Sequence, residues 1–96
     1  MSTSSPVVSV PMPEQLTLQG SAQTLLRLKP LLTQQAGPTV ALDAAPMRVF
    51  DTSAVAVLLE LRNGLLAEGK SLQVLRMPER LKALVALYGV AELLPA

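Results

Sequence analysis

Residues 39–66 read TVALDAAPMRVFDTSAVAVLLELRNGLL, and the order of strand, loop and helix in this stretch decides the fold. Residues 40–42 are apolar, include a β-branched valine and stop at Asp43, a pattern typical of a short buried strand. A second apolar pair follows at residues 49–50. From Ala54 the spacing of apolar residues changes to three and four, which predicts a helix over residues 54–67. The positions expected to share its inner face are Val55, Leu58, Leu59, Arg62, Leu65 and Leu66.

Three polar residues, Asp51, Thr52 and Ser53, stand at the hinge between this loop and this helix. All three are capping types, because a side-chain oxygen can accept from the unpaired N–H groups of the first helical turn. The hydroxyl pair is thus presented at the positive end of a helix, which favours an anion or a polar group of a partner. The helix is also more apolar at residues 54–59 than one packed face requires. The excess indicates either complete burial or a second face that meets a partner protein.

The N-terminal part predicts a hairpin followed by a helix. Residues 7–10 and 16–18 have strand patterns, and the prolines between them predict a turn, with the first strand at a sheet edge. Residues 21–35 follow as a helix, in which Pro30 is expected to cause a kink or a break. The residues expected to begin and end this helix are Ser21 and Gly37, and its apolar face comprises Leu25, Leu28, Leu31 and Leu32.

The C-terminal part predicts one more strand and one more helix. Gly69 ends the central helix, and residues 71–75 alternate as a strand. Pro78 opens the last helix at a first-turn position, and Gly89 closes it. The apolar face of this helix comprises Leu81, Leu84, Val85 and Tyr88. Alternating strands and helices predict the α/β class, as one domain over residues 7–96 behind a short polar tail at 1–6.

Composition excludes several functions. The chain has 96 residues, half of them hydrophobic, which suits one domain with an aliphatic core. A net charge of +1 with interleaved signs and only two aromatic residues is not a nucleic-acid surface. Cysteine and histidine are both absent, so the usual thiolate and imidazole metal ligands are missing. No apolar run approaches the roughly 18 residues of a membrane span. With no secretory signal pattern at the N-terminus, we expect a cytoplasmic protein.

The candidate nucleophile Ser53 has no histidine base to activate it, and the Gly-x-Ser-x-Gly pattern does not occur. Neither a phosphate-binding loop nor a dinucleotide fingerprint occurs either. The sequence therefore predicts a protein without catalytic residues, metal or cofactor. Simple helix capping by Thr52 and Ser53 stays open as an alternative to a binding role for them.

Three segments taken together resemble a STAS domain, the module of anti-sigma factor antagonists. They are VALD at 40–43, VFDTSAV at 49–55 and, after the leucine-rich helix, EGKSLQV at 68–74. The family pattern is a strand, an Asp-x-Ser-Gly-like loop and a helix ending in glycine, and the resemblance covers residues 7–95. Within the family the chain is most similar to the MlaB-like subunit of Mla-type phospholipid ABC transporters. This rests on the Asp51–Thr52 pair, on Pro30, and on the ending LVALYGV at 84–90 followed by LLP.

The resemblance implies a single STAS domain, with a mixed four- to five-stranded sheet and helices packed mainly on one face. It also implies a non-enzymatic cytoplasmic subunit that binds and stabilises the ATPase subunit of a transporter, which with its permease moves phospholipid between membranes and maintains lipid asymmetry. No small-molecule substrate is implied. The implied partner-binding residues are Asp51, Thr52, Ser53, Ala54, Val55 and Ala56. Thr52 is the expected key polar contact.

Two other functions stay open at this point. An anti-sigma factor antagonist would bind a kinase-type anti-sigma factor and be switched by phosphorylation of Ser53. Ala54 stands where that branch usually has glycine, which weighs against the switch. A small lipid- or nucleotide-binding domain would instead be stabilised by its ligand alone, without a protein partner.

Overall fold

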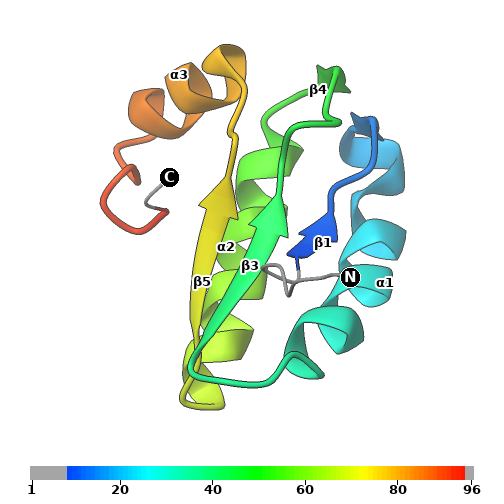
Figure 1. Cartoon of the computed structure of the whole chain (residues 1–96). Helices are drawn as coiled ribbons and strands as arrows, with labels where there is room; N and C mark the ends of the chain where they lie inside the picture. Colours follow the sequence, from blue (N-terminus) through cyan, green and yellow to red (C-terminus); the bar gives the residue numbers. More distant parts are fainter. Residues whose placement is uncertain (1–8, 95–96) are drawn as a thin grey trace, which may run out of the picture.

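The computed structural model describes residues 9–94 and shows parallel strands packed against helices, which confirms the predicted α/β class (Figure 1). The predicted tail and the start of the predicted first strand lie outside the described residues. In chain order the elements are β1 Ser9–Pro11, β2 Gln15–Leu16, a 3-10 helix η1 at Leu18–Gly20, α1 Ser21–Thr33, β3 Thr39–Asp43, β4 Val49–Phe50, α2 Ser53–Ala67, β5 Ser71–Leu75 and α3 Glu79–Leu87.

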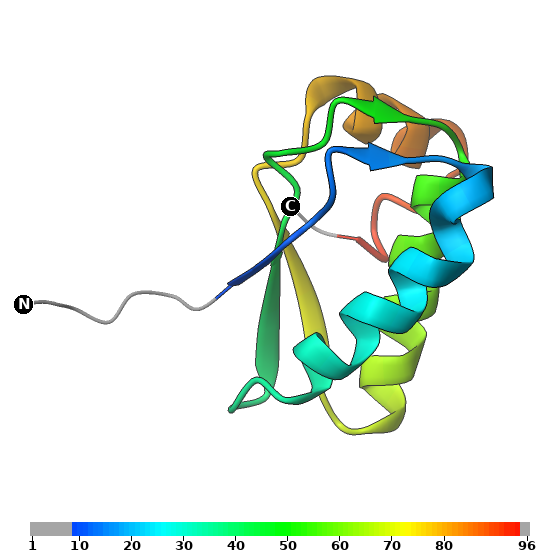
Figure 2. The same ribbon diagram turned by 90° about the vertical axis from the view of Figure 1, so that its right-hand side faces the viewer.

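The main sheet has the order β1-β3-β5, and both of its strand pairs are parallel. Its register places Val10 beside Leu42 and Leu42 beside Val74, so one row of buried side chains crosses the sheet. Parallel neighbours need a crossover, and α1 and α2 supply the two that this sheet requires. Figure 2 shows α1 and α2 side by side on one face of the sheet, as predicted, with α3 at the end where the strands finish.

The predicted hairpin near the N-terminus is wrong. β1 pairs with β3, and β2 pairs in parallel with β4, so residues 9–16 run alongside one segment of the chain without reversing. Between the two pairs Met12 N–H still donates to the Asp43 carbonyl at 2.8 Å. Pro11 and Pro13 cannot donate to a ladder, and they mark an interruption in the pairing rather than a turn. The resemblance implies one mixed sheet of four to five strands, but the five described strands form a three-stranded and a two-stranded sheet, and every pairing among them is parallel.

The helix α1 runs through Pro30 without a break. Proline removes the hydrogen bond to the Leu26 carbonyl, but Leu26 and Pro30 both lie on the exposed side, where water can satisfy that carbonyl. The inner face is made by Thr24, Leu28 and Leu32, whereas the predicted Leu31 is 44% exposed. Gly37 follows the helix with φ +92°, which agrees with the predicted stop.

The inner face of α2 is rotated from the predicted one. The prediction was right for Val55, Leu58 and Leu65, but Leu66 is 46% exposed and Leu61 takes an inner position. The strand β5 has the predicted bounds, and Gly69 has the left-handed φ of +78° expected after α2. In α3, Leu81 and Val85 are buried, but Tyr88 is exposed and Pro78 is the residue before the helix rather than its first residue.

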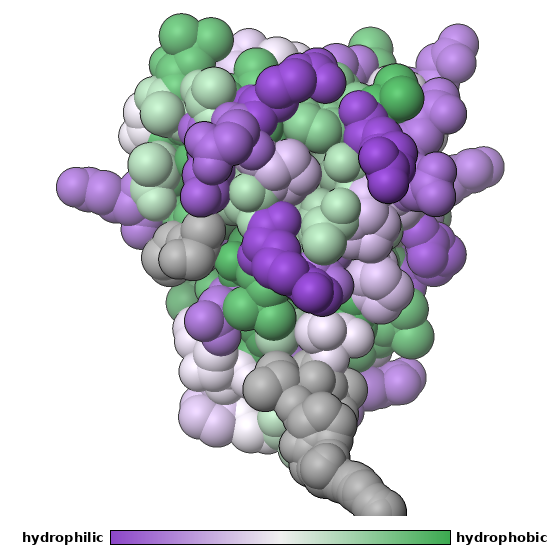
Figure 3. Space-filling view, turned by 45° about the horizontal axis from the view of Figure 1, so that its top comes forward, coloured by the Kyte–Doolittle hydropathy of each residue, from purple (hydrophilic) through white to green (hydrophobic). Residues whose placement is uncertain are grey.

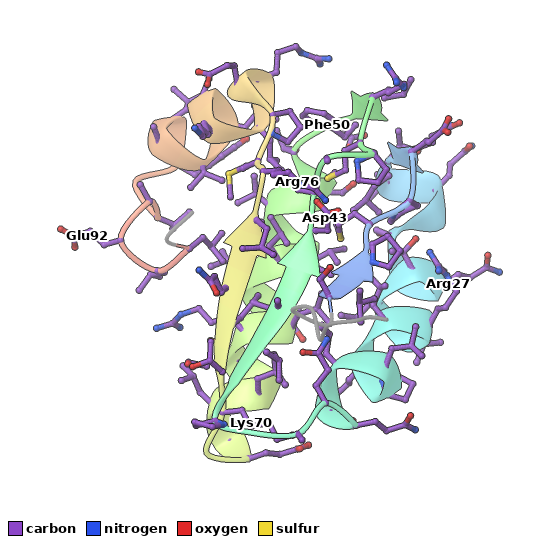
Figure 4. The ribbon with its side chains drawn as sticks, viewed as in Figure 1. Arg27, Asp43, Phe50, Lys70, Arg76 and Glu92 are labelled. Carbon is purple, nitrogen blue, oxygen red and sulfur yellow. The ribbon has the colours of Figure 1, made fainter. Side chains whose placement is uncertain are left out.

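Two polar contacts hold the opposite ends of the main sheet (Figure 4). At the end where the strands finish, the Arg76 guanidinium pairs with both oxygens of Asp43, and Arg76 has a positive φ of 53°, which is uncommon for a residue other than glycine. At the other end the Lys70 ammonium donates to the carbonyls of Thr33 at 2.9 Å and Gln35 at 2.5 Å. A cation at a helix C-terminus satisfies its free carbonyls and opposes its dipole.

The core is aliphatic, as the composition predicted, and Phe50 is its only aromatic member among the described residues. Its largest fully buried side chains are Leu16, Leu28, Leu32, Leu42, Leu58, Leu61, Leu65 and Leu81. Figure 3 shows the end of the molecule where the strands finish, and there strongly hydrophilic side chains alternate with small apolar patches. Within the described residues, no helix has the length and apolar character to cross a membrane.

Candidate functional site

The hinge before α2 is organised by the Asp51 carboxylate. Its Oδ1 accepts from the Ser53 backbone N–H at 2.9 Å and from the Ser53 hydroxyl at 2.5 Å, while its Oδ2 accepts from the Leu18 N–H at 3.2 Å. Thr52 already has helical backbone angles and makes no capping hydrogen bond with its side chain. Of the three predicted capping residues, Asp51 is therefore the one that caps the helix.

These hydrogen bonds lower the pKa of Asp51. The main cause is the hydrogen bond from the Ser53 hydroxyl, followed by the Ser53 backbone N–H, with a smaller contribution from Leu18. All of them stabilise the ionised form. The hinge thus carries a fixed negative charge at the positive end of α2.

The six predicted site residues divide between surface and core. Asp51, Thr52 and Ala56 are exposed, and Ser53 is half-buried. The side chains of Ala54 and Val55 are buried in the core, with 0% and 4% exposure, so they position the helix more than they present a surface. Thr52 and Ala56 are four residues apart and lie on one outward line of α2.

Two shallow grooves flank this line. The first lies between the start of α1 and the first half of α2, has a volume of about 600 Å³, and is lined by Leu18, Ser21, Ala22, Leu25, Asp51, Thr52, Ser53, Ala56, Val57 and Glu60. The second lies between α2 and the end of α3, has a volume of about 340 Å³, and is lined by Thr52, Val55, Ala56, Leu59, Tyr88 and Val90. Thr52 and Ala56 line both grooves and form a ridge between them.

Several residues of this surface were missed in the sequence. The sequence predicts a strand at Leu18, which instead lies in the 3-10 helix and is 76% exposed. It also predicts Tyr88 on the apolar face of the last helix, but Tyr88 is 54% exposed. Glu60 had no assigned role, and it lines the first groove. The signal available for Tyr88 was its position directly before Gly89, where the helix ends and packing no longer demands burial.

The geometry at Ser53 does not activate a nucleophile. Its hydroxyl donates to a carboxylate whose pKa is lowered, and a carboxylate with a lowered pKa is a weak general base. Among residues 9–94 no three acidic side chains gather in a way that would hold a metal ion. The arrangement can instead offer apolar grooves, an exposed hydroxyl and a fixed negative charge to another macromolecule.

The parallel sheet with helices on one face, and a polar hinge leading into an apolar helix, define an α/β module of the STAS type. The family described as "Mlab, STAS domain" matches residues 3–95. The chain therefore belongs to the MlaB-type STAS family, which confirms the resemblance noted from its motifs. A search of curated proteins found no match to the chain.

Proposed function

We propose that the protein is a non-catalytic subunit that binds the ATPase subunit of an Mla-type ABC transporter and stabilises or regulates it. The transporter would move phospholipids between the membranes of a Gram-negative cell and so maintain the asymmetry of the outer membrane. The match to the MlaB-type family over residues 3–95 supports the proposal. On this proposal the protein is cytoplasmic and reaches the inner membrane only through its partner and the permease.

The observation that carries the proposal is the position of Thr52. It is exposed at the start of α2, on the ridge between the two grooves, and within the described residues its hydroxyl makes no capping hydrogen bond. A surface that combines apolar grooves with a few polar side chains is typical of protein interfaces, where apolar contacts supply affinity and a few polar contacts supply specificity. Asp51, Ser53 and Ala56 complete the proposed surface, with Ala54 and Val55 holding the helix beneath it.

The exposed apolar side chains around the ridge support the same proposal. Leu18 stands beside the first groove with 76% exposure, and Tyr88 beside the second with 54%. Exposed leucine and tyrosine side chains on both sides of one helix favour a partner protein over free solvent.

The test is a pull-down of the tagged protein from its own host in mild detergent, followed by mass spectrometry. We expect an ABC ATPase together with its membrane permease. Recovery of a soluble kinase-type anti-sigma factor without the ATPase would overturn the proposal.

A second candidate, an anti-sigma factor antagonist, is favoured by one observation. Ser53 is a half-buried serine at the position that a kinase modifies in that branch of the family. A phosphate there would stand beside the Asp51 carboxylate, which in the unmodified protein accepts a hydrogen bond from the Ser53 hydroxyl. The repulsion between the phosphate and the carboxylate would rearrange the hinge. Phosphate incorporation at Ser53 on incubation with the recovered kinase would support this candidate.

A further inference from the structure

The groove between α1 and α2 is acidic. Its lining includes two carboxylates, Asp51 at the hinge and Glu60 more than two turns along α2, and no basic residue. Asp51 is occupied by three internal hydrogen bonds, but Glu60 is exposed. The ion pairs found within residues 9–94 do not involve Glu60. Glu60 is therefore the carboxylate that is available to a partner.

Within residues 9–94, no lysine or arginine side chain forms an ion pair with Glu60. Lys29 of α1 lies against Gly64, one turn beyond Glu60, where its Cε would be 3.4 Å from a Cβ added at that glycine. Arg76 pairs with Asp43, and Arg80 stacks on the Phe50 ring, 4.8 Å from its centroid. The groove thus combines an apolar wall with a negative charge that the described part of the chain does not neutralise through an ion pair.

We propose that this groove receives a segment of the ATPase subunit in which an aliphatic side chain stands beside a lysine or arginine. The aliphatic side chain would pack on Leu18 and Leu25, and the cation would pair with Glu60 in the field of Asp51. The inference rests on the proposed function, since it names the chemistry by which the partner is recognised at that same surface.

The charge disfavours the other occupants of an apolar groove. A phospholipid would bring its phosphate toward two carboxylates, which repel it. A second copy of the chain, meeting this face across a two-fold axis, would set the acidic groove against itself and oppose like charges. A basic protein segment is instead attracted by the negative charge that repels both of these occupants.

The test uses variants of Glu60 with a matched control at Glu68. Both residues are exposed glutamates of the α2 region, but Glu68 follows the helix and does not line the groove. Affinity for the purified ATPase subunit is measured by isothermal titration at low and at high salt. We expect Glu60→Gln to weaken binding about threefold and Glu60→Lys about tenfold or more, while Glu68→Lys binds as wild type. The wild-type affinity should fall with salt more steeply than that of Glu60→Gln.

Ala56→Arg on the ridge separates the inference from the proposed function. Each variant is first checked for its fold by circular dichroism. If Ala56→Arg abolishes binding while both Glu60 variants bind as wild type, the cation contact is wrong and the proposed interface stands. If Ala56→Arg also binds as wild type, the interface itself is wrong and both fall. If Glu60→Lys binds the ATPase subunit with wild-type affinity, the inference is overturned. A gain of sedimentation of that variant with anionic phospholipid vesicles would then favour lipid as the occupant. Loss of a self-associated dimer in that variant would favour a second copy.

Discussion

The Asp51 carboxylate accepts a hydrogen bond from the Leu18 backbone N–H at 3.2 Å, and so one residue ties two segments that lie 33 positions apart. The same carboxylate caps α2 through Ser53. The exposed Leu18 beside the first groove and the start of α2 are therefore held by one side chain. Asp51 is thus a positioning residue for Leu18 and for the first turn of α2.

Replacing Asp51 with alanine should remove the hydrogen bonds that hold Leu18 and the first turn of α2. We expect the melting temperature to fall by a few degrees and the Leu18 amide to exchange with solvent faster, because its acceptor is lost. Amide hydrogen exchange measured by NMR tests this directly. Asp51→Asn keeps one carbonyl oxygen as an acceptor and serves as the milder control. Unchanged exchange at Leu18 in the alanine variant would contradict the positioning role.

Replacing Thr52 with alanine should separate binding from folding. Thr52 is exposed and its side chain makes no capping hydrogen bond, so the free energy of unfolding should change by no more than about 0.5 kcal/mol. On the proposed function, affinity for the ATPase subunit should fall by about tenfold, since Thr52 would supply a central polar contact. Urea unfolding and titration calorimetry on the same sample measure the two quantities. A variant that unfolds, or that binds normally, would show that Thr52 has been assigned wrongly.

Replacing Gly64 with alanine should stabilise the protein. Gly64 lies inside α2, where glycine costs about 0.5–1 kcal/mol relative to alanine. The new Cβ would contact Lys29 Cε at 3.4 Å, and the end of a flexible lysine can shift to accept it. The free energy of unfolding in urea should rise by about that amount. A loss of stability would mean that Lys29 is held more tightly against α2 than its exposed end indicates.

Acid should weaken the ion pair between Asp43 and Arg76. The hydrogen bond from the Arg76 side chain, followed by the Ala45 N–H, lowers the pKa of Asp43 below the ordinary value of about 3.9. Because the folded-state pKa is the lower one, the stabilisation is fully present above the ordinary value and is lost as the pH falls through the folded value. Because the pKa of Asp51 is also lowered, its stabilising contribution is likewise lost as the pH falls.

The Asp43→Asn variant isolates this effect. At neutral pH it should be less stable than wild type by about 1 kcal/mol, because Arg76 is largely exposed and the pair is screened by solvent. As the pH is lowered from neutral into acid, the melting temperatures of the two proteins should converge. The wild type then loses the charged pairing of Asp43 with Arg76, which the variant lacks at every pH. Parallel curves would show that Asp43 does not titrate with a lowered pKa.

Much of the fold was predictable because its elements carry strong local signals. The strand over residues 71–75 alternates cleanly, and Gly37, Gly69 and Gly89 stand after the three helices with the positive φ angles that glycine tolerates. The helix faces were less accurate: Leu31, Leu66 and Tyr88 are apolar and correctly spaced, yet they are exposed. Spacing shows that a helix has an apolar side, but only its neighbours decide how far that side is covered.

By itself, the sequence determined the α/β class, the aliphatic core, the polar hinge at residues 51–53 and the membership of the STAS family. Tertiary structure alone decided that β1 and β2 run parallel to β3 and β4, that Asp51 rather than its neighbours caps α2, and that Leu18 and Glu60 share a groove. The physical reason is the distance along the chain over which each kind of interaction acts. Capping types, breakers and periodicity act within a few residues, whereas strand direction and groove lining depend on contacts between segments far apart in the chain, which local patterns do not encode.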